Sequence, residues 1–190
     1  MTEEKQLVKD ILDGNSEGYR IFIHQYNRLV NHVVFKMVSN EADREDISQE
    51  VFVKAYRNLP NFKFDSKVST WLARIAYNTC LNYLEKKQIP LYQDVVAEGA
   101  CIDENPGFEV KPDQFTIDRN MAYKLCREID ELPVNYGLIL SLYHLQEMTY
   151  KEISDILSMP EGTVKSYLFR ARKLLKDRLV RNFCLEDLCL

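Results

Sequence analysis

Apolar residues recur at intervals of three and four along almost the whole chain, and no stretch alternates strictly as a half-buried strand would. This spacing predicts an all-α fold. Two helices are expected up to Met37, with a break at residues 14–16. A third is expected from about Asp43 to Leu59, ended by Pro60, and a fourth from about Ser69 to Lys87. The third helix is expected to bury Ile47, Val51, Phe52, Ala55, Tyr56 and Leu59.

Helical periodicity disappears between residues 88 and 115, where prolines and glycines fall among acids. That composition is typical of a linker. The sequence therefore predicts two small helical domains, residues 1–87 and 116–183, joined by a flexible acidic linker at 88–115 and followed by an apolar tail at 184–190.

A helix-turn-helix pattern closes the second domain between Thr149 and Lys176. Thr149 and Glu152 have the spacing of a capping box, residues 158–162 form the turn, and a second helix starts near Thr163. Opposite its apolar stripe this helix presents a basic face that suits a DNA major groove. The residues of that face are Lys165, Ser166, Phe169, Arg170 and Lys173. The alternative is an ordinary helical hairpin with a solvated basic face.

The distribution of charge supports a nucleic-acid partner, although the net charge is −4. Residues 165–181 hold seven basic side chains and one acid, whereas residues 88–118 hold seven acids and one lysine. A basic helix is thus combined with an acidic linker.

Several functional classes are disfavoured by the sequence. The five cysteines are scattered without a C-x-x-C pair, which argues against a disulfide framework or a structural zinc site. No run of about 18 apolar residues could span a bilayer, and residues 1–13 do not resemble a signal peptide, so we expect a cytoplasmic protein without membrane insertion. No catalytic motif is present, so we expect neither an enzyme nor a cofactor.

Three segments resemble one known family, the extracytoplasmic-function (ECF) sigma factors of bacterial RNA polymerase. The segment EGTVKSYLFRARKLLKDRL is similar to the family's recognition-helix signature. The segment DREDISQEVFVKAY resembles the helix that binds the clamp helices of the polymerase, and FDSKVSTWLARIAYNTCLNYL resembles the segment that recognises and melts the promoter. The resemblance implies an alternative sigma factor that promotes transcription initiation.

The resemblance also assigns expected roles to residues. For the minus-35 element it implies contacts from Thr163, Lys165, Ser166, Tyr167, Phe169, Arg170, Arg172, Lys173 and Lys176. Tyr167 departs from the arginine that the family commonly has there, which puts the promoter sequence in doubt. For polymerase binding it implies Asp43, Asp46, Gln49, Glu50, Phe52 and Lys54. A solvated charged face is the alternative for some of these.

For the minus-10 element, a polar row and a loop are the candidates. Arg74, Asn78 and Asn82 stand four residues apart beside the stripe that contains Trp71. The preceding loop mixes aromatic and basic residues that suit an unstacked base and its phosphates. Its candidates are Asn61, Phe62, Lys63, Phe64, Ser66 and Lys67. The alternative is that Phe62 and Phe64 are core residues.

The implied partners are core RNA polymerase, promoter DNA and an anti-sigma factor. A stand-alone helix-turn-helix regulator, with the first domain as a sensor or dimerisation unit, is the main alternative. It would bind a palindromic duplex without polymerase. A helical interaction protein without a DNA role is a third reading.

Overall fold

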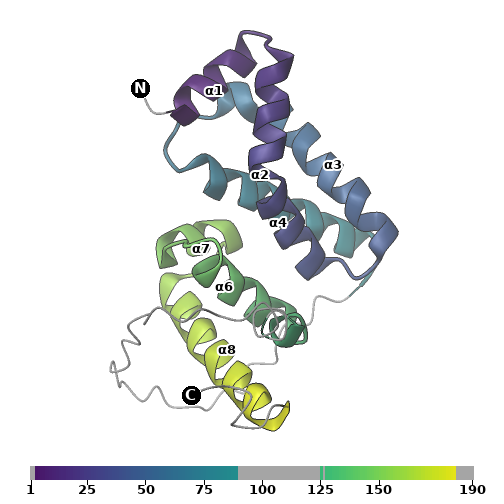
Figure 1. The fold of residues 1–190 in the computed structure, drawn as a ribbon, viewed down its shortest axis with the longest axis vertical. Helices are drawn as coiled ribbons and strands as arrows, with labels where there is room; N and C mark the ends of the chain where they lie inside the picture. The colour runs from purple at the N-terminus through teal and green to yellow at the C-terminus, as the bar shows by residue number, and fades with distance from the viewer. Residues whose placement is uncertain (1–2, 90–124, 126, 183–190) are drawn as a thin grey trace.

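The computed structural model describes residues 3–89, 125 and 127–182, and in these residues the chain is helical without any strand (Figure 1). In the first domain the helices are α1 (Glu3–Leu12), α2 (Ser16–Met37), α3 (Glu41–Asn58), the 3-10 turn η1 (Leu59–Asn61) and α4 (Val68–Lys86). In the second they are α6 (Val134–His144), α7 (Tyr150–Leu157) and α8 (Glu161–Asn182), and residues 127–130 before them are also helical. The predicted all-α class is confirmed.

Local sequence signals explain where the helices of the first domain begin and end. Asn15 accepts hydrogen bonds from the backbone at the start of α2, and Asn40 does the same for α3. Gly14, with φ of 88°, makes the predicted break between α1 and α2. Pro60 lies in η1 directly after α3, as expected for a residue that cannot continue a helix.

The first domain packs α1, α3 and α4 around α2. Val30, Val33 and Leu72 are completely inaccessible to solvent, and so is Cys80, whose pKa burial raises to about 12. One expected core residue is not buried: Tyr56 is 50% exposed. It extends from the flank of the buried stripe of α3 and makes an edge contact with Tyr19 of α2. The expectation for Tyr56 was therefore wrong.

The second domain is built around the predicted helix-turn-helix. Ile153 of α7 and Leu168 of α8 are buried with Leu138 of α6. The capping box between Thr149 and Glu152 is present at the start of α7, as predicted. The second helix starts at Glu161, slightly earlier than the expected Thr163, because its first turn follows directly from the turn after α7.

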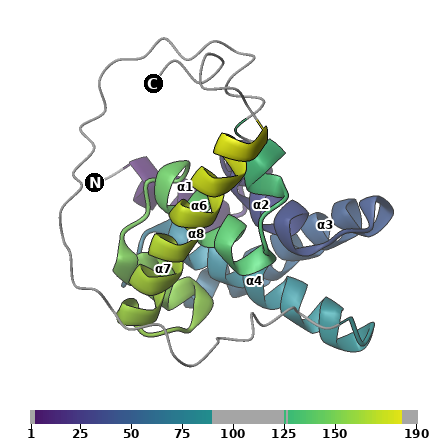
Figure 2. The same cartoon turned by 90° about the horizontal axis from the view of Figure 1, so that it is seen from below.

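The two domains pack against each other, which the sequence did not predict. Helix α7 lies against α4, and α6 lies against α2 (Figures 1 and 2). Most of the predicted linker and the whole predicted tail lie outside the described residues, so the domain boundaries stay predictions. Among the described helices, none has the length and apolar character needed to cross a membrane.

Candidate nucleic-acid and protein interfaces

Helix α8 presents a basic and aromatic surface away from its buried side. Val164, Leu168 and Ala171 are buried and fix the orientation of the helix. On the other side Lys165 and Lys173 are exposed, four residues before and after Phe169, which is itself 68% exposed. If this face had no partner, the exposed ring would be unfavourable in free energy, because it leaves apolar surface in water. The arrangement suits contact with DNA bases and phosphates.

Other residues expected on this surface already have intramolecular contacts. Arg172 lies over the ring of Tyr143 at 5.3 Å and its guanidinium is 3.2–3.3 Å from Nε2 of His144. Tyr167 is half-buried, and its ring centroid lies 5.4 Å from that of Tyr136. The hydroxyl of Ser166 donates to the carbonyl of Gly162 at 2.9 Å. Arg170 and Thr163 are partly exposed and Lys176 is exposed.

Helix α4 carries a surface of different chemistry. Arg74, Asn78 and Asn82 are all exposed and follow one another at every fourth residue, so they form one row. The opposite side of α4 is buried against α2 and α3. Two amides and a single guanidinium make this row far less basic than α8.

An aromatic cluster precedes this row. The ring of Phe62 lies 4.7 Å from that of Phe64 and 4.9 Å from that of Trp71, measured between centroids. Phe62 and Trp71 are partly buried, whereas Phe64 is 37% exposed and Lys5 lies over its ring at 5.4 Å. Phe64 has φ of 60°, a conformation that costs a non-glycine residue free energy and is common at binding sites.

The remaining loop residues differ in their surroundings. Asn61 and Lys63 are exposed and Ser66 is half-exposed. Lys67, at the start of α4, forms an ion pair with Glu152 of the second domain, with 2.9 Å between Nζ and Oε1. The loop is therefore partly engaged with α7.

The exposed side of α3 is acidic and amide-rich. Asp46, Gln49 and Glu50 all face solvent, and Glu50 pairs with Lys54 at 2.8 Å. Asp43 instead accepts hydrogen bonds from Lys87 and Tyr83 at 2.7 and 2.6 Å, and these bonds hold the pKa of its carboxyl below the usual range. Asp43 thus joins α3 to the end of α4.

An apolar groove of about 440 Å³ lies beside these polar residues, between α2 and α3. Gln49 and the buried Phe52 line it together with Val53 and Tyr56, which are 48% and 50% exposed. Tyr19 closes one wall: its hydroxyl donates to the carbonyl of Phe52 at 2.6 Å, and burial raises its pKa to about 12. Val53 was not among the predicted contact residues, and Tyr56 was predicted to lie in the core. The available signal was the position of Val53, four residues after Gln49 and therefore on the same exposed face.

In the parts of the chain that the structure describes, no group of three His, Cys, Asp or Glu side chains could hold a metal ion.

Comparison with known proteins defines the class. Residues 22–89 match the family model of sigma-70 region 2, and residues 124–175 match that of sigma-70 region 4. Helices α3 and α4 lie in the first match, and α6, α7 and most of α8 in the second. The chain combines the two domains of a sigma factor of RNA polymerase.

Whole-chain relatives define the group within that class. The ECF RNA polymerase sigma-E factor of Escherichia coli K12 is 33% identical over 180 residues, which cover 93% of this chain and 94% of the relative. The ECF sigma factor SigW of Bacillus subtilis is 28% identical, with 92% and 96% of the two chains covered. The chain belongs to the ECF sigma factors and is an alternative sigma factor for transcription initiation.

Two solved structures share its fold. CnrH, in complex with the cytosolic domain of CnrY, has a TM-score of 0.62 at 18% identity and covers 93% of this chain and 97% of its own. The sigma factor RpoE of Bartonella quintana, in complex with the anti-sigma factor NepR, has a TM-score of 0.59 at 20% identity and covers 86% and 99%.

Proposed function

We propose that this sigma factor uses three separate surfaces to bring core RNA polymerase to a promoter and to open it. The α3 surface and its groove bind polymerase, α8 reads the minus-35 element, and α4 with its preceding loop captures the minus-10 element. The observation that carries the proposal is the presence of all three surfaces, exposed and chemically distinct, at the segments that resemble these functional regions.

At the minus-35 element, α8 enters the major groove with its exposed face. Lys165, Arg170 and Lys173 supply the positive charge that duplex DNA attracts, and arginine can bind the edge of guanine with two hydrogen bonds. Phe169 lies among them and contacts an apolar edge, such as the methyl group of thymine. Arg172 and Tyr167 act through their contacts inside the domain, which hold α8 against α6.

At the minus-10 element, the target is an unstacked strand. The aromatic cluster of Phe62, Phe64 and Trp71 offers ring faces on which a base can stack, and Lys63 is placed to meet a phosphate. Asn78 can both donate to and accept from the edge of a flipped base. A neutral amide suits this role, because it adds sequence preference without adding affinity for any duplex.

At the polymerase interface, the groove between α2 and α3 receives an apolar side chain of the partner. Val53 and Tyr56 supply the exposed apolar area, and Asp46, Gln49 and Glu50 form a polar rim beside it. An apolar centre with a polar rim is the usual anatomy of a specific protein interface.

An anti-sigma factor is the proposed regulator, since Bartonella RpoE is bound to one. We place the protein in the cytoplasm with the polymerase and assign it no catalytic activity of its own. Both assignments rest on its membership of the sigma family.

The direct test is run-off transcription by bacterial core polymerase on a library of genomic promoters, with and without the protein. New start sites that require the protein are expected. Asn78→Ala and Arg170→Ala should weaken them about tenfold or more, the loss expected for a base or phosphate contact.

Matched variants control for nonspecific damage. Arg181→Ala removes the same charge from the end of α8, where the guanidinium contacts only the backbone of Asp177 among the recorded bonds, and Gln25→Ala removes an exposed amide from α2. Both should leave the transcripts unchanged. No stimulation of polymerase, together with tight binding to duplex DNA alone, would instead support the stand-alone regulator.

A further inference from the structure

Two ion pairs connect the first domain to the second. One joins the start of α4 to the start of α7, and the other joins the end of α2 to the segment before α6. The two ion pairs lie at different contacts between the domains, so together they fix one arrangement of the first domain relative to the second.

Glu152 is the centre of the first contact. Its Oε1 lies 2.9 Å from Nζ of Lys67 and accepts a hydrogen bond of 3.4 Å from the hydroxyl of Thr70. Its Oε2 accepts from the backbone amide of Thr149 at 2.8 Å. Burial opposes ionisation of this carboxyl, but the bonds from Thr149 and Lys67 outweigh it and hold the pKa below its usual range. One carboxylate therefore caps α7 and pairs with the first turn of the promoter-melting helix.

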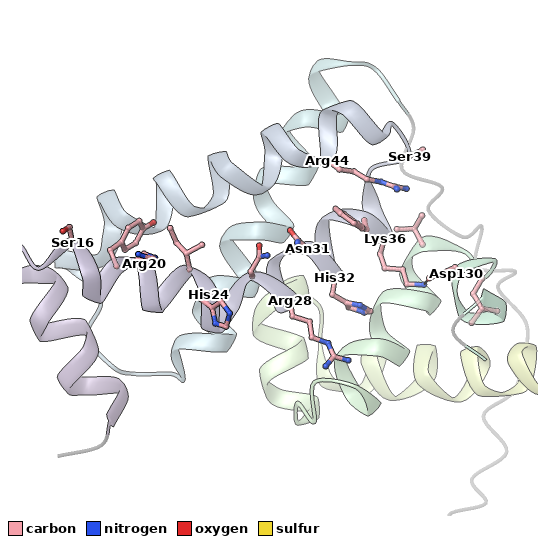
Figure 3. A pocket seen from close by; sticks show the side chains of 16 residues that line it. Ser16, Arg20, His24, Arg28, Asn31, His32, Lys36, Ser39, Arg44 and Asp130 are labelled. Atoms are coloured by element: carbon pink, nitrogen blue, oxygen red, sulfur yellow. Dashed lines mark hydrogen bonds and ion pairs between the residues drawn. The ribbon is translucent and has the colours of Figure 1, made fainter. Parts of the chain in front are cut away.

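Lys36 and Asp130 form the second contact. They lie side by side at one end of a trough of about 1260 Å³ that follows α2 (Figure 3). The side chain of Lys36 is only 9% exposed because α6 covers it. A side chain at Gly137 of α6 would place its Cβ 3.6 Å from Nζ of Lys36 and 3.0 Å from the carbonyl oxygen of Ile129, so a glycine allows this close approach.

This arrangement is incompatible with simultaneous use of both DNA-binding surfaces. The path from Glu152 to Phe169 along α7, the turn and α8 is at most about 35 Å, and that from Lys67 to Asn78 along α4 is about 17 Å. The two side chains and the ion pair between them add at most about 13 Å, so the backbones of Asn78 and Phe169 lie within about 65 Å of each other while Lys67 and Glu152 are in contact. Elements centred near minus 10 and minus 35 are about 85 Å apart, at 3.4 Å per base pair.

The chain is long enough to resolve this conflict. The 35 residues from 90 to 124 can span at most about 115 Å, so the domains can separate without any break in the tether. Separation requires that both ion pairs dissociate.

We propose that the Lys67–Glu152 and Lys36–Asp130 pairs are a latch that holds the free sigma factor closed and that opens when the factor engages a promoter. In the closed state the ammonium of Lys67 is occupied by Glu152 and the two DNA-binding surfaces are too close together to be used at once. The proposal rests on the function proposed above, but the closed contact can be tested without DNA.

The test is zero-length cross-linking of the purified full chain with a carbodiimide, which joins an ammonium to a carboxylate only when the two touch. The amide formed between Lys67 and Glu152 is quantified by mass spectrometry. Lys36→Glu breaks the distant pair, and it should lower the Lys67–Glu152 yield about fivefold or more, because the two contacts belong to one closed state. Lys36→Glu combined with Asp130→Lys restores an attractive pair and should recover the yield.

Arg20→Glu is the matched control. It makes the same change of charge on the same helix, but Arg20 is largely exposed and pairs only with Glu17 within α2 among the recorded ion pairs. Its cross-link yield should equal that of the unmodified protein. Circular dichroism establishes that each variant keeps its helical content.

The outcomes separate the two proposals. The latch would be refuted if the cross-link were absent in the free protein, or if its yield were the same in the Lys36→Glu variant. Retention of the full yield in a transcribing promoter complex would also refute it while leaving the sigma function intact. A cross-link that responds as expected in a protein that never stimulates polymerase would support the closed contact and refute the sigma function.

Discussion

The two helices proposed to contact DNA, α4 and α8, differ in the chemistry of their exposed faces. The face of α8 is basic, with lysines on both sides of an exposed phenylalanine, whereas α4 offers two amides and one arginine next to a cluster of aromatic rings. A positively charged face attracts any DNA duplex, and this attraction weakens as the salt concentration rises. Neutral amides and rings gain little from a duplex, since its bases are already paired and stacked, but they hold a base that has left the stack.

From this difference we expect affinity for duplex DNA and strand opening to depend on separate domains. A sigma factor needs affinity for duplex DNA to find the promoter, and it needs strand opening to start transcription. Variants of α8 should therefore change salt-dependent binding, and variants of α4 and its loop should change opening.

The largest effect is expected from Arg170→Ala combined with Lys173→Ala. Loss of two cations from α8 should weaken binding of the polymerase-bound protein to minus-35 duplex about a hundredfold in low salt. It should also make the slope of log affinity against log salt shallower by about two. Fluorescence anisotropy across a salt series measures both quantities.

Asn78→Ala is the comparison for that experiment. It should leave the affinity for duplex DNA and the salt slope unchanged, and it should reduce open-complex formation, read by permanganate reactivity of unpaired thymines. Equal salt slopes for the two variants would show that the division between α4 and α8 is wrong.

A smaller and more selective effect is expected at Phe64. Loss of its ring should weaken binding of single-stranded minus-10 DNA about tenfold, within the range measured for stacking of a base on an aromatic ring. Because Phe64 has φ of 60°, Phe64→Gly should be more stable than Phe64→Ala by about 1 kcal/mol, although both lose the ring.

Denaturant unfolding and single-strand binding of both Phe64 variants separate the two contributions. If both variants lose the same amount of binding but differ in stability, the ring of Phe64 contributes to DNA binding while its backbone conformation lowers the stability of the fold. Binding that follows stability instead would assign Phe64 to the structure of the loop.

The sequence predicted the helices well because their signals are local. The break at residues 14–16, Pro60 and the Thr149–Glu152 capping box act within a few residues of their own positions, and each has the predicted effect in the structure. The exposed row of α4 and the buried stripe of α8 follow from helical periodicity alone. Their roles in DNA binding stay predictions.

Contacts between distant segments could not be predicted in this way. Nothing in the local pattern shows that Glu152 serves both Thr149 and Lys67, or that Lys36 meets Asp130 across the domains. Tyr56 was misplaced because a residue at the edge of an apolar stripe can face either the core or a groove. That choice depends on where α2 packs, which single-helix periodicity does not contain.

The smallest expected effect is the pH dependence of stability, to which His32 at the domain junction and His144 in the second domain both contribute. Burial and the nearby charge of Lys36 lower the pKa of His32, and Asp130 only partly opposes this lowering. Burial and the charge of Arg172 likewise lower the pKa of His144. The unfolded chain therefore binds more protons than the folded one just below pH 6.5, so stability falls as the pH drops through that value. The melting temperature should decrease by a few degrees between pH 7.5 and 5.5, a range in which the carboxyls with lowered pKa values stay ionised.

His32→Gln should make this decrease smaller, because glutamine keeps a polar group at the junction but does not titrate. His24→Gln, on the exposed side of α2, is the control and should leave the pH dependence unchanged. Among the described residues the buried Nε2 of His32 has no hydrogen-bond partner, so no hydrogen bond compensates for its loss of water when it takes up a proton. If both variants give the same pH dependence as the unmodified protein, the junction does not contribute to acid sensitivity, and any decrease must be assigned to His144 in the second domain.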